Sequence, residues 1–328
     1  MTIQKPNIPT ESNAKAEGRR PRPSAAVRSQ TDRFAKRTFF VITLLPMFLI
    51  GTVTVALLVR SWPIMATHPI WELIFGTVWK PDDGLFGFWP FIVGTFWVTF
   101  VGVALAVPPC LLVAIYLSEY AHSFTRSLAK PVLDLLAAIP PVVYGLWGLL
   151  AIVPFIEDVL IPFSKKWLGA IPFLAAKQPT GFSILAGGMV LAVMIAPLVI
   201  SVIYEIFATV PNDLRHASLA IGATKWETIR RVVIPQVLPG IIAGIVLGAS
   251  RAFGETIAVL MVVGNVAKLP GSIFDAAYPL PALIANNYGD MMSIPMYDAA
   301  LLGAALILLV VILIFNILST IVLKRFLK

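Results

Sequence analysis

The sequence predicts an all-α integral membrane protein, a bundle of six transmembrane helices. Of its 328 residues, 58% are hydrophobic and only 13% are charged, whereas a soluble domain carries roughly 25% charged residues. The apolar residues gather in six stretches, each long enough to cross about 30 Å of hydrocarbon. Basic residues gather in the segments on one side of these stretches. Together these observations exclude a soluble globular protein.

The six predicted spans share a length of at least 20 residues and a nearly uncharged composition. They are Thr38–Val59, Phe88–Leu117, Val132–Phe155, Phe182–Tyr204, Val237–Val266 and Ala299–Leu323. The second span is overlong and contains Pro108-Pro109, which predicts a kink or an extra helix along the membrane surface before it. Pro140-Pro141 predicts a further kink in the third span.

Residues 1–37 are polar, basic and interrupted by four prolines. A cleavable signal peptide would place its apolar stretch earlier. The segment is therefore predicted to be a disordered cytoplasmic tail, which either only orients the protein or also holds anionic lipid. Residues 38–328 are predicted to form the transmembrane domain.

The distribution of Lys and Arg predicts the orientation. Of the 25 basic residues, 18 fall in the tail, the second and fourth connections and the C-terminus, and five fall in the other loops. The positive-inside rule then places both termini in the cytoplasm. The net charge of +8 is thus a signal of topology and not of nucleic-acid binding. Cys110 is the only cysteine, and the three histidines are scattered, so no disulfide and no metal site are predicted.

The longest cytoplasmic connection between spans, residues 207–236, predicts two short helices joined at a glycine. Apolar residues recur after Pro211 at spacings of three and four. Gly222 then permits a sharp turn. Pro235 and Pro239 are expected to end the second helix and to start span five. The predicted product is a compact knob whose apolar ridge fits a groove on a soluble partner.

This connection resembles the "EAA" coupling loop in the permeases of bacterial ABC importers. That motif has Glu-Ala-Ala, three residues, Gly, nine residues, and then Ile-x-Leu-Pro. Gly222 and Pro235 match it, whereas His216 stands in place of Glu and Ser218 in place of the second Ala. The resemblance implies an ATPase coupling loop that contains Arg215, His216, Ala217, Ser218, Gly222, Ala223 and Pro235.

Three more stretches make the chain similar to the phosphate-specific permeases. They are residues 139–148, which differ from the Ile-Pro-Ser-Val-Val-Tyr-Gly-Leu-Trp-Gly motif by Pro141 in place of Ser, and residues 222–227 and 251–259. Of the two paralogous subunits of such importers, the chain resembles the PstC type. In that type Gly-Glu-Thr precedes an Ala-Val run that ends near Gly-Asn, here Gly264-Asn265. The resemblance covers residues 38–328.

The resemblance implies the type I architecture of ABC importer permeases, a location in the cytoplasmic (inner) membrane, and import of inorganic phosphate by alternating access. It also implies three kinds of partner: one sister permease (PstA-like), two ATPase subunits that form a dimer (PstB-like), and one outer phosphate-binding protein (PstS-like). The sequence has no Gly-x-x-x-x-Gly-Lys-Ser/Thr phosphate loop. The chain is therefore predicted not to be an enzyme, and ATP and Mg are expected on the ATPase subunits.

Arg251 and Glu255 lie in the middle of an otherwise apolar predicted span. A central arginine costs about 2.5–3.5 kcal/mol on insertion scales, and such residues normally face a protein interior or a water-filled path. They are four residues apart and are therefore predicted to share one helical face. Either they neutralise each other as an ion pair, or they and the adjacent Thr256 face the substrate pathway. In the second case Arg251 binds phosphate oxygens, and Glu255 accepts the hydroxyl proton that sulfate lacks.

Span five also carries small residues four apart, at Gly240, Gly244, Gly248 and Ala252. Such a stripe lets another helix approach closely, so helix packing is predicted there. Two rival functions are kept open: the same machinery for sulfate or molybdate, and a secondary transporter without an ATPase partner. A secondary transporter needs no cytoplasmic knob and often shows internal repeats.

Overall fold

The computed structural model describes residues 25–176, 180–289, 294 and 296–326. The chain divides into two units, residues 1–56 and 57–328. The first helix, α1 (Ala25–Thr67), supplies the described part of the first unit. Its apolar side chains are exposed there, for example Met47 and Phe48, as expected of a helix that lies in hydrocarbon. Residues 25–37, predicted as disordered, are helical, and residues 1–24 lie outside the described residues.

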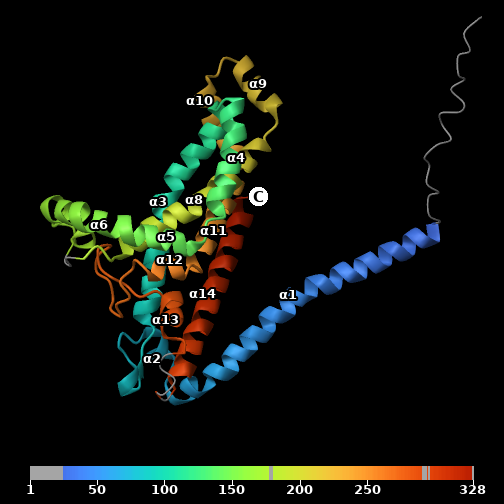
Figure 1. The fold of residues 1–328 in the computed structure, drawn as a ribbon. Coiled ribbons are helices and arrows are strands. Elements are labelled where there is room, and N and C mark those ends of the chain that lie inside the picture. Colours follow the sequence, from blue (N-terminus) through green and yellow to red (C-terminus); the bar gives the residue numbers. More distant parts are fainter. Residues whose placement is uncertain (1–24, 177–179, 290–293, 295, 327–328) are drawn as a thin grey trace, which may run out of the picture. The chain divides into compact units, whose positions relative to one another are not determined.

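The second unit, from residue 57 on, is almost entirely helical (Figure 1). Its helices after α1 are α2 (Ile70–Phe75), α3 (Trp89–Ile115), α4 (Ser123–Ala137), α5 (Pro141–Trp147), α6 (Val153–Phe155), α7 (Ile161–Phe163), α8 (Ile184–Ala208), α9 (Asn212–Ala220), α10 (Lys225–Thr228), α11 (Ile234–Phe253), α12 (Ile257–Leu260), α13 (Leu280–Asn287) and α14 (Tyr297–Phe326). Within the described ranges, π-helical segments are η2 (Tyr116–Tyr120), η3 (Gly148–Ile152), η4 (Ile156–Leu160), η5 (Ser164–Leu168) and η7 (Ile229–Val233).

The remaining elements are short. Strands β1 (Trp79–Lys80) and β2 (Leu85–Phe86) pair antiparallel around the 3-10 turn η1 (Pro81–Asp83), with Trp79 opposite Phe86. A second 3-10 turn, η6, covers Pro172–Leu174. In Figure 1, α9 and α10 lie at one end of this unit together with α4, and α2 and α13 lie toward the other end. The short helix α2 occupies the segment before span two, where an extra helix was one of the two expectations.

The prediction of six spans is confirmed. In the described part of the chain, six helices are long and apolar enough to cross a membrane: Asp32–Thr67, Trp89–Tyr120, Pro141–Trp167, Ile184–Ala208, Lys225–Phe253 and Tyr297–Ile321. Spans two, four and six begin within two residues of their predicted starts. Spans one, three and five start at residues other than those predicted. For spans three and five the cause lies in the local sequence.

Span three was predicted to start at Val132, but it starts at Pro141. The segment before it forms the separate helix α4, in which no residue is buried. Pro140 has an extended backbone, with φ −59° and ψ 138°. A residue that precedes proline is driven out of the helical region, so the Pro140-Pro141 pair separates two helices instead of kinking one.

The helix that follows continues through two prolines, and span five continues through another. Pro154, Pro162 and Pro235 each lie two residues after a π-helical segment. The wider π turn relieves the clash between a proline ring and the preceding turn. For this reason the expectation that Pro235 ends one helix and starts another was wrong: the helix runs without a break from Lys225 to Phe253.

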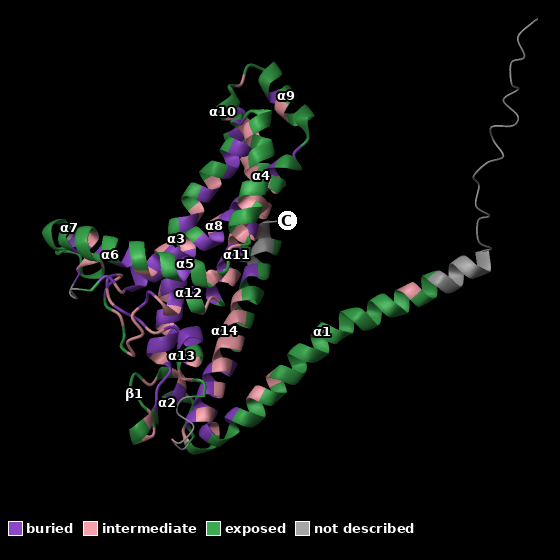
Figure 2. Ribbon diagram, in the orientation of Figure 1, coloured by how far each residue is buried: buried purple, intermediate pink, exposed green. Residues whose placement is uncertain are grey.

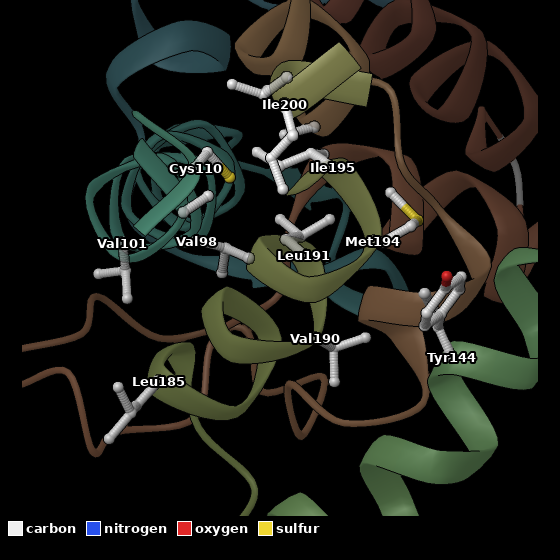
Figure 3. Close-up of a cluster of buried hydrophobic side chains, with 14 of the residues drawn as sticks. Val98, Val101, Cys110, Tyr144, Leu185, Val190, Leu191, Met194, Ile195 and Ile200 are labelled. Atoms are coloured by element: carbon white, nitrogen blue, oxygen red, sulfur yellow. The ribbon is translucent and has the colours of Figure 1, made fainter. Parts of the chain in front are cut away.

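The main core forms where α3, α5, α8 and α12 meet. Figure 3 shows α8 side chains such as Leu191 and Ile195 beside Val98 and Cys110 of α3. Figure 2 shows the same concentration of buried residues on α3 and α8. A smaller core at the other end of the unit surrounds Trp79, whose ring lies 5.1 Å from that of Phe91 between centroids. The Cys110 thiol is buried in the main core.

Candidate functional site

The loop between spans four and five has the predicted helix–glycine–helix form. Helix α9 ends at Ala220, and Gly222 follows with φ +91°, a left-handed conformation that favours glycine. Helix α10 starts with a capping box: the Thr224 hydroxyl accepts a hydrogen bond from the Glu227 backbone N–H, and the Glu227 carboxylate accepts one from the Thr224 N–H. We call residues 212–228, with α9 and α10, the knob.

The knob presents apolar side chains to its surroundings. Ile221 is 87% exposed, and Trp226 and Leu219 are about half exposed. His216 and Ala217 are exposed as well. An exposed apolar ridge on a structured protrusion is typical of a surface that docks against a partner.

Two of the predicted loop residues instead hold the knob together. Ser218 is buried and lies 2.9 Å from the Thr228 hydroxyl, so that the two side chains join α9 to α10. This contact explains why a serine stands where the related motif has alanine. The Ala223 backbone N–H donates to the Ser218 carbonyl and closes the turn. Pro235 lies outside the knob, in the helix that leads into span five.

Arg215 points back toward the membrane-spanning helices. Its guanidinium pairs with the Glu119 carboxylate at 2.8 Å, and it also donates to the carbonyls of Phe207 and Val210. The side chains of Arg215 and Glu119 are 17% and 7% exposed. The sequence analysis missed Glu119: it ends an apolar span, and nothing local ties it to an arginine 96 residues later.

Span five does not continue to Val266 as predicted. Helix α11 ends at Phe253, and the chain turns at Gly254 before the single-turn helix α12. Glycine has a low helix propensity. The Glu255 carboxylate accepts a hydrogen bond from the Ala258 N–H at 3.3 Å, which stabilises the start of the new helix instead of the continuation of the old one.

This break separates Arg251 from Glu255, so the prediction that they share one helical face was wrong. They form no ion pair either: the ion pairs among the described residues are Lys80–Asp83, Lys130–Glu205 and Glu119–Arg215. Arg251 is half-buried in the last turn of α11 and lies near enough to Tyr144 for electrostatic interaction. Mutual neutralisation is therefore not the reason for these two charges.

A small, partly open cavity lies beside the break. Its polar lining residues are Glu255 and two threonines of α3, Thr95 and Thr99. Apolar residues of α8, α11 and α12 and two prolines complete it. Of the three predicted pathway residues, Glu255 alone is among the lining residues. The Thr256 hydroxyl donates to the Gly254 carbonyl at 3.3 Å instead.

The glycine stripe of span five lies against α8. A Cβ atom added to Gly240 would come within 2.6 Å of Ile206, and one added to Gly248 within 2.4 Å of Val199. For Gly244 the neighbours are Val202 and Ile203 at 3.2 Å. The stripe therefore sets the close approach of α11 and α8, and the cavity lies beyond its end.

Among the residues that the structure describes, no group of three or more His, Cys, Asp and Glu side chains is arranged to hold a metal ion.

Comparison with known proteins bears on the whole arrangement. The chain is 35% identical over 243 residues to the phosphate transport system permease protein PstC of Xylella fastidiosa, covering 73% of this chain and 74% of that protein. It is 34% identical to PstC of Mesorhizobium japonicum over 86% of each chain. The crystal structure of a bacterial ABC transporter for the acidic polysaccharide alginate has a chain with the same fold, with a TM-score of 0.50, 16% identity, and coverage of 91% and 100%.

Residues 110–328 match the family described as the inner membrane component of binding-protein-dependent transport systems. The match includes the knob, the broken fifth span and the α8, α11 and α12 walls of the cavity, whereas Thr95 and Thr99 of the α3 wall precede it. The family match covers about two thirds of the chain. The alignments with the two relatives cover more than two thirds of it. The chain belongs to the family of inner membrane permease components of binding-protein-dependent transport systems.

Proposed function

We propose that this protein is the permease subunit of an ATP-driven importer of inorganic phosphate. The observation that carries the proposal is the 35% identity, over about three quarters of the chain, to a permease of a phosphate transport system. The knob, with its exposed Ile221 and Trp226, supports the requirement for an ATPase partner. Glu255 in a cavity beside a broken span supports a substrate path.

The proposed complex contains this chain, a PstA-like sister permease, two PstB-like ATPase subunits and a PstS-like binding protein. ATP and Mg bind to the ATPase subunits. Both termini of this chain lie in the cytoplasm, and so does the knob, on the side where basic residues are concentrated. Closure of the ATPase dimer moves the knob, and the cavity opens in turn to the two sides of the membrane.

Arg251 and Glu255 are the proposed substrate-selecting pair, with Thr256 beside them. A guanidinium matches two oxygens of an oxyanion. Phosphate near neutral pH keeps a hydroxyl that can donate to the Glu255 carboxylate, whereas sulfate has no such donor and is repelled. For this path to form, the small cavity has to widen toward Arg251 during the cycle.

The proposal is tested by phosphate uptake into vesicles that contain the complete complex, with ATP on the knob side and sulfate or molybdate as competitor. ATP-dependent phosphate uptake that sulfate does not inhibit supports it. If sulfate or molybdate is taken up in place of phosphate, the assignment to an ABC importer stands and the assignment of phosphate as the substrate is rejected. Uptake that needs no ATPase subunit would favour a secondary transporter.

Replacement of Glu255 by glutamine is expected to weaken the preference for phosphate over sulfate about tenfold, since the amide no longer repels a fully ionised oxyanion. The measurement is competitive uptake by a complex that transports without its binding protein, so that selection by that protein does not mask the effect. Glu72→Gln, in exposed α2, is the matched control. Unchanged selectivity in Glu255→Gln would reject the role given to this carboxylate.

Replacement of Ile221 by aspartate is expected to weaken binding of the ATPase subunits by about 30-fold, because central apolar residues of an interface commonly contribute 2 kcal/mol or more. The measurement is co-purification of the ATPase with the tagged permease at decreasing protein concentration. Val78→Asp changes an exposed apolar residue near β1 and should leave co-purification intact. Equal retention of the ATPase by both variants would contradict a docking role for the ridge.

A further inference from the structure

The buried ion pair between Glu119 and Arg215 connects two parts of the chain that the sequence separates widely. Glu119 lies in η2, the continuation of α3. Arg215 lies in α9 of the knob. The Arg215 guanidinium donates to both oxygens of Glu119, with Nη2 to Oε1 at 2.8 Å and Nε to each oxygen at 3.3 Å. A two-point contact of this kind fixes orientation as well as distance.

The same guanidinium holds the end of α8. It donates to the carbonyls of Phe207, at 3.0 Å, and Val210, and to the Asn212 side chain at 3.4 Å. One side chain thus joins the knob, the last turn of span four and the last turn of span two. Because both partners are largely buried, water screens this joint much less than it screens the exposed pair Lys130–Glu205.

The helix that ends at Glu119 also lines the cavity. Thr95 and Thr99 belong to α3, and about 20 helical residues, roughly 30 Å of helix, separate Thr99 from Glu119. The opposite wall of the cavity includes Ala252 and Phe253 of α11. Helix α11 follows the knob through unbroken helix from Lys225, whereas α3 has no such covalent connection to it.

We propose that the Glu119–Arg215 pair makes α3 move together with the knob, so that both walls of the cavity respond to the ATPase. Glu119 and Arg215 are positioning residues in this scheme, since neither lines the cavity. Without the pair, a displacement of the knob reaches α11 and α8 through the chain, and it reaches α3 only through the packing of α3 against α8. The inference rests on the proposed transport function and adds the route by which ATP hydrolysis acts on the substrate path.

The test is Glu119→Gln in the complete complex, with oxyanion uptake and ATP hydrolysis measured in the same vesicles. The neutral amide keeps the shape of the side chain and removes the charge. Uptake per ATP hydrolysed is expected to fall about tenfold, a typical size for a coupling between sites, while ATP hydrolysis stays within about twofold of the wild type. Glu205→Gln, which removes the exposed pair between α4 and α8, should leave the ratio unchanged.

A second variant, Arg215→Lys, keeps the positive charge but loses the two-point contact of the guanidinium. It should also lower the uptake per ATP hydrolysed. In the double variant Glu119→Gln/Arg215→Lys, uptake per ATP hydrolysed should fall no further than in the more impaired single variant, because both changes disable the same ion pair. Additive losses would contradict a shared role. An unchanged ratio in Glu119→Gln would overturn the proposal. So would a parallel fall of uptake, hydrolysis and yield of assembled complex, which indicates a purely structural role.

A measurement without substrate separates this inference from the identity of the oxyanion. Spin labels on cysteines introduced at two exposed positions, Asp213 on the knob and Tyr116 just after α3, report the distance between knob and helix in a Cys110→Ser background. In the otherwise unchanged protein that distance should be the same with and without ATP. In Glu119→Gln it should change or broaden when ATP binds. A distance that changes with ATP even when Glu119 is present would overturn the proposal, whichever oxyanion is transported.

Discussion

Arg251→Ala is expected to lower phosphate uptake by the reconstituted complex about 100-fold, while the complex still assembles. The guanidinium lies half-buried one turn before the break in span five, and among the described residues no carboxylate is within ion-pair distance of it. A charge in the middle of a span is costly, and here no protein carboxylate offsets that cost. A charge-assisted contact to a bound oxyanion contributes about 1.5–3 kcal/mol, which corresponds to the expected loss.

Uptake is measured in vesicles at saturating ATP, and assembly is measured by co-purification of the ATPase. Arg251→Lys should retain part of the uptake, since an ammonium keeps the charge without the two-point geometry. Arg60→Ala removes an exposed arginine of α1, in the last quarter of span one, and should have no effect. If uptake survives Arg251→Ala intact, the arginine is structural, and the substrate path runs along another face.

Gly188→Leu is expected to prevent folding of the permease or to lower its melting temperature by about 10 °C. Helices α3 and α8 cross where Gly188 meets Val101 and Gly102. A Cβ atom at position 188 would lie 2.5 Å from Val101 Cγ1 and 3.2 Å from the Gly102 backbone nitrogen. The backbone atom cannot rotate away, so the helices must separate, at a cost of about 3 kcal/mol or more.

The check is a thermal melt of the purified complex in detergent, together with its yield. Gly51→Leu is the matched control, because a Cβ atom at Gly51 would have no neighbour within 4 Å. A melting temperature for Gly188→Leu equal to that of the control would mean that α3 and α8 do not cross at this point.

The number of spans was predictable because hydropathy accumulates over about 20 residues and tolerates local irregularity. The same averaging hid the features that shape the site. The stretch Val237–Val266 is apolar apart from a few polar residues, Ser250, Arg251, Glu255, Thr256 and Asn265, so it was predicted as one helix. Only the local balance at Gly254, with the Glu255 side chain accepting from the Ala258 N–H, ends that helix. Pro140-Pro141 separates helices in the same local way.

The knob was predictable for a different reason: its glycine turn and capping residues are encoded within some 20 neighbouring residues. What the knob touches was not predictable. Ser218 was identified as a departure from a motif, and its contact with Thr228 gives the departure a structural role. The pairing of Arg215 with Glu119 needed the fold, since each residue alone is an ordinary charge at the end of an apolar segment.

The π turn at Ile229–Val233 has a consequence for the angular phase of span five. An α-helix rotates about 100° per residue, and a π turn accommodates one more residue than the α turn that it replaces. The segment that carries Arg251 is therefore rotated about the helix axis, relative to the knob, by the angle of one residue compared with an uninterrupted α-helix. Deletion of a single residue from this turn would let it close as α-helix and would swing the Arg251 guanidinium about a quarter of a turn around the helix axis relative to the knob. The direction in which the arginine points is thus set about 20 residues before it, by an insertion that carries no charge.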